Sequence, residues 1–170
     1  GAKRVQTVSI DLVADEIDCG KPDRISPADR IELAGIESYD YPVYPAERAV
    51  ADKACGIVER HSGRPSSRVK DLVDIVVYAR NVAFGFDTLS AALKTEFSVR
   101  KLASSRTFST PPEWGDAQAR QYRRLAEQTG TPNHFHDIRN AETLAKKLIE
   151  PCLSDRTDLS VWSTKTLTWE

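Results

Sequence analysis

The sequence predicts an α+β fold, with short strands near the N-terminus, a helical bundle in the middle and a strand at the C-terminus. Two observations predict the strands: apolar residues alternate over residues 5–13, and alternation with Thr and Trp returns over residues 159–169. A third predicts the bundle, because apolar residues recur at helical spacing between residues 45 and 151. With 170 residues, of which 40% are hydrophobic, the chain can bury a core.

Residues 5–13 place Val8, Ile10 and Leu12 on one face of the predicted strand and Asp11 on the other. Residues 14–40 are rich in Asp, Pro and Gly and predict a long loop, with a short helix near residues 27–33. Residues 41–44 predict a short edge strand, since Pro42 removes a hydrogen-bond donor from the ladder.

Five helices are predicted after these strands. The first covers residues 45–61 with Pro45 at its first position, and the second is capped by Ser66 or Ser67 and runs to about Val82. Asp87 is predicted to cap the third, which ends near residue 101. The fourth covers residues 113–128, and the fifth covers residues 137–151 with Asp137 at its start. We therefore expect two domains, residues 1–44 with the strands and residues 45–170 with the helices.

The overall charge does not indicate a nucleic-acid or membrane surface. Lys and Arg number 24 and Asp and Glu number 25, for a net charge of -1, so any basic site has to be local. Cys19, Cys55 and Cys152 are odd in number and widely spaced, which argues against a disulfide framework or a zinc site. No apolar run of 18 residues and no signal peptide are present, so we expect a cytoplasmic protein without a membrane span.

The chain contains no methionine and opens with Gly1. We therefore expect that Gly1 is not a translation start and that the chain is processed or is a piece of a longer protein.

The densest group of charged side chains lies on the first two predicted helices and the turn between them. These residues are Lys53, Arg60, Arg64, Arg68, Lys70, Asp71 and Asp74. Asp74 borders the apolar stripe of the second helix, where an unpaired carboxylate would be costly. Lys53 on the preceding helix is its expected partner.

Two interpretations of this group remain open at the level of the sequence. In the functional one, Lys53 and Arg68 hold triphosphate oxygens, and Asp71 orients Lys53 or assists the acceptor. In the structural one, the same residues form an ordinary network of salt bridges on a solvated face.

Asp11 also has two interpretations. A lone Asp on the polar face of a strand is usually just solvated. A carboxylate facing a cleft can instead bind Mg²⁺ together with substrate phosphates. The sequence holds no DxD and no glycine-rich phosphate loop, so a complete metal site is not visible. His134 and His136 could offer two imidazoles to a metal, but no Cys or third His lies near them.

Several short motifs together resemble the AbiEii/AbiGii nucleotidyltransferase toxin family. They are Ser9-Ile10-Asp11, Tyr44-Pro45, Ala51-Asp52-Lys53, Arg60, Ser67-Arg68-Val69-Lys70-Asp71-Leu72-Val73-Asp74, Phe97 with Arg100, and Pro111-Pro112 with Trp114. The resemblance covers most of residues 4–130. Its most specific element is SRVKDLVD with ADK upstream.

The resemblance implies short strands of a nucleotidyltransferase-like sheet followed by a helical domain. It implies metal-dependent transfer of a nucleotidyl group from an NTP, with Mg²⁺ or Mn²⁺ as the metal, onto an RNA such as tRNA, and inhibition by a cognate antitoxin protein. Carried over by position, Lys53 and Asp71 become catalytic residues and Asp11 a metal ligand. The NTP-binding residues become Lys53, Arg68, Lys70 and Asp74.

The chain departs from the family pattern at its start. The first family motif, a Gly-Ser followed by a DxD, has no counterpart in the sequence and would lie upstream of Gly1. We therefore expect the chain to be the C-terminal portion of such an enzyme. A non-catalytic helical module that binds an antitoxin or another protein is the alternative, and in it the same charges are structural.

Overall fold

The computed structural model of the chain describes residues 21–26, 39–102, 106–156 and 158–170. Backbone contacts divide the chain into two compact units, residues 1–43 and residues 44–170. Over the described residues the fold is α+β, with five α-helices, two 3-10 helices and two small antiparallel strand pairs. The predicted fold class is confirmed. The assignment of the first unit to the end of a nucleotidyltransferase core stays a prediction.

The described part of the first unit is one antiparallel strand pair. Strand β1 (Asp23–Ile25) pairs with β2 (Tyr41–Val43), and Arg24 lies opposite Pro42. The strand predicted at residues 41–44 is confirmed. The loop predicted for residues 14–40 is wrong at β1, because a three-residue strand that is exposed throughout carries no alternating pattern to detect. Asp11, the strand at residues 5–13 and the short helix near residues 27–33 lie outside the described residues.

The two helices that carry the charged group begin and end slightly differently from the prediction. Helix α1 (Ala46–Val58) has Pro45 at the N-cap position, one residue before the predicted place. It ends before His61, because His61 pairs with Arg64 around a tight turn in which Gly63 has a φ of 77°. Helix α2 (Val69–Asn81) has Arg68 at its N-cap position without a side-chain cap, so the cap predicted at Ser66 or Ser67 is wrong. The Ser66 hydroxyl instead accepts the backbone N–H of Arg68 at 3.2 Å.

The remaining helices are α3 (Phe86–Val99), α4 (Asp116–Ala126) and α5 (Ile138–Leu153), with 3-10 turns at Glu127–Thr129 and Asn133–His136. Gly85 occupies the N-cap position of α3, so the cap predicted at Asp87 is wrong and Asp87 lies in the first turn. The cap predicted at Asp137 is confirmed, because its carboxylate accepts the backbone N–H groups of Arg139 and Asn140.

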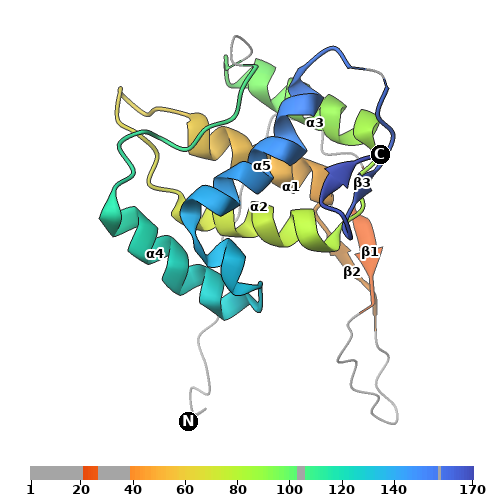
Figure 1. The fold of residues 1–170 in the computed structure, drawn as a ribbon. Coiled ribbons are helices and arrows are strands. Elements are labelled where there is room, and N and C mark those ends of the chain that lie inside the picture. The colour runs from red at the N-terminus through yellow and green to blue at the C-terminus, as the bar shows by residue number, and fades with distance from the viewer. Residues whose placement is uncertain (1–20, 27–38, 103–105, 157) are drawn as a thin grey trace, which may run out of the picture. The chain divides into compact units, whose positions relative to one another are not determined.

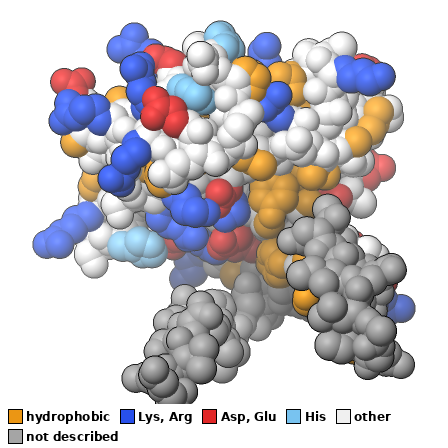
Figure 2. Space-filling view, turned by 90° about the horizontal axis from the view of Figure 1, so that it is seen from below, with side chains coloured by type: hydrophobic (Ala, Val, Ile, Leu, Met, Phe, Trp, Pro, Cys, Tyr) orange, Lys and Arg blue, Asp and Glu red, His pale blue; other side chains and the backbone are white. Residues whose placement is uncertain are grey.

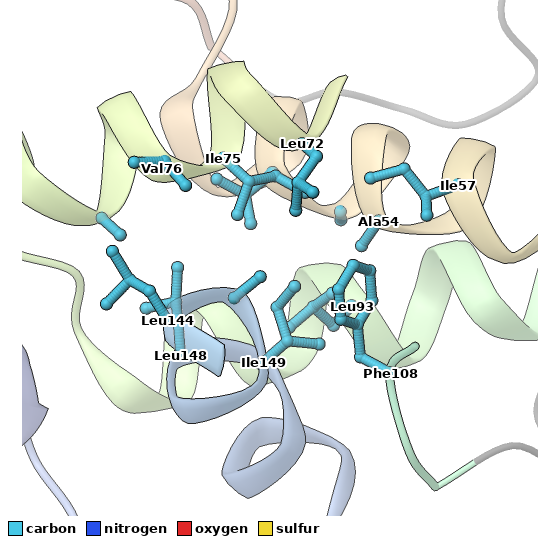
Figure 3. Close-up of a cluster of buried hydrophobic side chains, with 14 of the residues drawn as sticks. Ala54, Ile57, Leu72, Ile75, Val76, Leu93, Phe108, Leu144, Leu148 and Ile149 are labelled. Atoms are coloured by element: carbon cyan, nitrogen blue, oxygen red, sulfur yellow. The ribbon is translucent and has the colours of Figure 1, made fainter. Parts of the chain in front are cut away.

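The core forms where α1, α2, α3 and α5 pack together. Helix α1 contacts both α2 and α3, and α5 contacts the same two helices, while α4 packs mainly against α2 (Figure 1). In Figure 3 the side chains of Ile57, Leu72 and Ile75 point toward those of Leu148 and Ile149. All five are fully buried, so the apolar stripes predicted for these helices do face one another.

The C-terminal residues close the core with a hairpin. Strand β3 (Trp162–Ser163) pairs with β4 (Thr168–Trp169), so the single strand predicted for residues 159–169 is a pair of two-residue strands. Trp162 is fully buried, and its indole Nε1 donates to the carbonyl of Ala79 at 2.6 Å. The Trp169 indole donates to the carbonyl of Leu148 at 3.1 Å. Each helix within the described ranges is too short or too polar to span a lipid bilayer.

Trp162→Ala is expected to lower the free energy of unfolding by about 3–5 kcal/mol, because it empties a large buried site and leaves the Ala79 carbonyl without its donor. Urea denaturation followed by circular dichroism measures this change. Val161→Ala is the matched control, since Val161 is exposed, and it should change stability by less than about 0.5 kcal/mol. Equal effects of the two substitutions would contradict the assignment of Trp162 to the core.

Candidate functional site

The side of the α1–α2 pair that carries Lys53 gathers most of the predicted site residues. The Lys53 ammonium Nζ donates to Asp74 Oδ2 at 2.9 Å and lies 3.7 Å from Asp71 Oδ1. The predicted partnership of Lys53 and Asp74 is therefore confirmed. Lys70 lies one helical turn before Asp74 and donates to both of its carboxylate oxygens, at 2.8 and 3.0 Å.

Arg68 enters the same group from the start of α2. Its guanidinium Nε lies 2.6 Å from Asp71 Oδ2, and a second nitrogen lies 3.7 Å from Asp52 Oδ2. The contact between Arg68 Nε and Asp71 Oδ2 is an ion pair without hydrogen-bond alignment. Asp71 Oδ2 is buried and therefore remains without a hydrogen bond within the described part of the chain. The Arg68 side chain is 46% exposed and that of Asp71 is 9% exposed, so the cation reaches solvent and the carboxylate does not.

The two aspartates of α2 differ in electrostatic environment. Burial raises the pKa of the Asp71 carboxyl above its ordinary value, although the positive charges of Arg68 and Lys53 act against this. Burial also acts to raise the pKa of Asp74, but hydrogen bonds from Lys70 and Lys53 outweigh it and the pKa of Asp74 is lowered. Burial acts to lower the pKa of Lys53, yet the bond to Asp74 and the charge of Asp71 raise it overall. Lys53 is therefore a permanent cation at neutral pH.

The sequence prediction gave no site role to a second set of charges beside these residues, although Asp52 and Arg100 belong to the family motifs. Arg100, just after α3, donates to Glu96 at 2.7 Å, to Glu59 at 3.2 Å and to Asp52. Asp52 thus lies between Arg100 and Arg68. The spacing of four residues between Glu96 and Arg100 could have indicated their pairing. The contact of Arg100 with Asp52, 48 residues away, has no signal in a single sequence.

The other cations of the predicted group, Arg60 and Arg64, lie in the segment between α1 and α2. Arg60 pairs with Glu113 and donates to the carbonyl of Gly63. Arg64 and His61 line an open hollow in the loop before α2, and Arg68 forms one border of it. Figure 2 shows blue and red side chains lying side by side on the face it displays. The charges there are mixed, which agrees with paired residues more than with a single-sign patch.

The described residues do not form a metal site. No group of three or more His, Cys, Asp and Glu side chains within them could hold a metal ion. The carboxylates of Asp71 and Asp74 face Lys53, Arg68 and Lys70, so a divalent cation would have to displace positive charges. His134 and His136 face Asn140 and the carbonyl of Thr131 instead. The predicted ligand Asp11 lies outside the described residues.

Comparison with protein-family models gives a match to the nucleotidyl transferase AbiEii toxin of type IV toxin-antitoxin systems over residues 1–149. The chain belongs to this family. The resemblance seen in the sequence is therefore confirmed, and the match extends it to most of α5. No curated protein and no solved structure matched the chain. In this AbiEii family member, Lys53, Arg68, Lys70, Asp71 and Asp74 contact one another. Their convergence with Asp11 lies outside the described residues, and their roles in catalysis and NTP binding stay predictions.

Asp74→Asn should cost about 1–3 kcal/mol of stability at pH 7, because the charged partner of Lys53 and Lys70 is lost. The folded-state pKa of Asp74 is lowered, so the stability it contributes is present above its unfolded pKa of about 3.9 and is lost as pH falls through the lower folded pKa. Urea denaturation of the parent protein and of Asp74→Asn should show a difference in the free energy of unfolding that narrows below about pH 4.

The control for this pH series is Asp155→Asn, since Asp155 is 81% exposed and distant in sequence from α1 and α2. It should leave stability within about 0.5 kcal/mol of the parent protein at every pH. A gap between Asp74→Asn and the parent that stays constant from pH 7 to pH 2.5 would show that the charge of Asp74 is not what stabilises the fold.

Proposed function

We propose that this AbiEii family member binds the triphosphate of an NTP at the Lys53 side of α1 and α2, and serves transfer of the nucleotidyl group onto an RNA acceptor of the tRNA class. The single observation that carries the proposal is the convergence of Lys53, Arg68, Asp71 and Asp74 from two helices. These are the residues to which the family resemblance assigns NTP binding and catalysis.

The cations in this group suit phosphate oxygens in two different ways. Lys53 is a compact point charge whose direction is fixed by Asp74, so it would bind one phosphate oxygen without first losing side-chain freedom. Arg68 offers a planar fork, and nearly half of its side chain is exposed. Asp71 has the longer contact with Lys53, 3.7 Å, so an incoming phosphate would compete with Asp71 more easily than with Asp74. In this proposal Asp71 orients Lys53 and Arg68.

Nucleotidyl transfer of this kind uses Mg²⁺, or Mn²⁺ in its place, to neutralise phosphate charge and orient the reacting oxygens. The described residues hold no group of three or more His, Cys, Asp and Glu side chains that could bind it. We propose Asp11 as one ligand, with further carboxylates contributed from outside the described residues. Within the described residues, the proposal assigns positioning of the triphosphate to Lys53 and Arg68 and assigns no bond-making step.

We further propose that the protein works in the cytoplasm and that a cognate antitoxin protein limits its activity, as the toxin-antitoxin family implies. The competing candidate is a non-catalytic helical module that binds a partner protein. One observation favours it: Lys53 and Lys70 are already paired with Asp74, and Arg68 with Asp71, so each cation has a carboxylate partner without a ligand.

Lys53→Ala is expected to weaken NTP binding at least tenfold, because it removes a cation that hydrogen-bonds charged groups. Isothermal titration calorimetry with each of the four NTPs in the presence of Mg²⁺ measures the loss. Lys94→Ala is the matched control, since Lys94 is an exposed lysine on α3. The NTP affinity of this variant should equal that of the parent chain. Circular dichroism spectra recorded in parallel establish that both variants are folded.

The titration is repeated with a form of the protein extended upstream of Gly1, which tests whether metal ligands come from residues outside this chain. Mg²⁺-dependent NTP binding by either form supports the proposal. Absence of NTP binding by both forms, with the folded state intact, would overturn it in favour of the interaction module.

A further inference from the structure

Helix α1 carries a glycine, Gly56, in its last turn, where alanine would favour the helix more. A Cβ atom added at Gly56 would lie 2.5 Å from one terminal nitrogen of Arg68, 2.9 Å from its Cζ and 3.2 Å from its Cδ. The guanidinium of Arg68 therefore lies directly against the backbone of α1. No side chain larger than a hydrogen atom fits at position 56 while Arg68 stays in this place.

Arg68 is held on its other sides by two carboxylates. Asp71 contacts Nε at 2.6 Å, and Asp52, one helical turn before Gly56 on α1, contacts a terminal nitrogen at 3.7 Å. Asp52 is itself fixed from α3, because its other carboxylate oxygen accepts a hydrogen bond from Arg100. Arg100 in turn bonds Glu96, which is 3% exposed, so the chain of contacts ends in the core.

We propose that Gly56 and Asp52 are positioning residues that fix the direction of Arg68 for an NTP phosphate. This inference rests on the proposed function and deepens it. Gly56 provides the space in which the guanidinium of Arg68 lies against α1. Asp52 is held by Arg100, next to α3, and in turn holds Arg68. Arginine has a long side chain with many rotamers, and a side chain that is fixed before the ligand arrives loses less entropy on binding.

The first test is Gly56→Ala. The atoms that the new methyl group would meet belong to the outer half of a flexible side chain, so Arg68 is expected to move while the helix stays intact. Affinity for the NTP should fall roughly tenfold, the loss expected for one charge-assisted contact. The melting temperature reports separately on the fold, because alanine favours the helix while a displaced Arg68 leaves the buried Asp71 carboxylate with a weaker partner. A purely structural role for Gly56 predicts a lower melting temperature with unchanged affinity.

Gly115→Ala is the matched control. Gly115 has a negative φ of -104°, and a Cβ atom there would meet nothing within 4 Å. This substitution should leave NTP affinity unchanged. A loss as large as that of Gly56→Ala would show that the assay does not report on the position of Arg68.

The second test repeats the substitution after Arg68→Ala, which removes the group that the methyl would strike. Gly56→Ala should then cause no further loss of affinity, and Asp52→Asn should likewise weaken binding only while Arg68 is present. An equal loss with and without Arg68 would mean that Gly56 does not act through this arginine, and the inference would be wrong.

The Nε–H resonance of Arg68 in a nitrogen-15 spectrum gives a readout that needs no nucleotide. Gly56→Ala and Asp52→Asn should shift it, and Gly115→Ala should not. If the parent chain binds no NTP, the proposed function fails, and a shifted resonance still supports the positioning of Arg68. If the parent binds NTP while Gly56→Ala leaves affinity and resonance unchanged, only the positioning fails.

Discussion

Helix α1 has packing partners on two sides, α2 and α3, and this constraint governs the charges around it. Its charged side chains cannot all reach open water, so each one near an interface needs an opposite charge on a neighbouring helix. Lys53 finds Asp74 on α2, and Asp52 finds Arg100 next to α3. The polar contacts thus fix how α1 lies against its neighbours, while the apolar stripe in the core provides most of the stabilisation.

The same constraint links the core to the candidate site. Arg68 lies at the first residues of α2 and is nearly half exposed, yet its position depends on Gly56 and Asp52 of α1. Asp71, which contacts Arg68 through an ion pair, is almost fully buried, and that burial raises its pKa. Exposed cations over buried carboxylates are suited to an anionic ligand, since the cations can reach the ligand while the carboxylates hold them in direction.

Local sequence patterns predicted most of the helices and part of the site. Asp74 beside an apolar stripe required a cation, and Lys53 on the preceding helix was an expected partner, so this pair could be predicted. The order of Arg68, Lys70, Asp71 and Asp74 within one short motif led to the family resemblance that the family comparison confirms.

Other features depended on tertiary contacts that a single sequence does not carry. From the sequence, Gly56 only lowers the helix propensity of α1, and its close contact with Arg68 shows only in the structure. Arg100 and Asp52 meet across 48 residues, and β1 is too short and too exposed to show alternation. The observed helix ends also differ from the predicted ends by up to three residues, because turns such as the one joining His61 to Arg64 compete with the helix for the same backbone groups.

The C-terminal hairpin has a practical consequence for defining this domain. The family match ends at residue 149, inside α5, whereas Cys152 and Trp162 beyond it are fully buried. Trp162 also bonds the backbone at Ala79 and Phe84, at the end of α2 and just before α3. A protein cut at the family boundary would therefore lose part of its interior, and expression boundaries should follow the packing beyond residue 149.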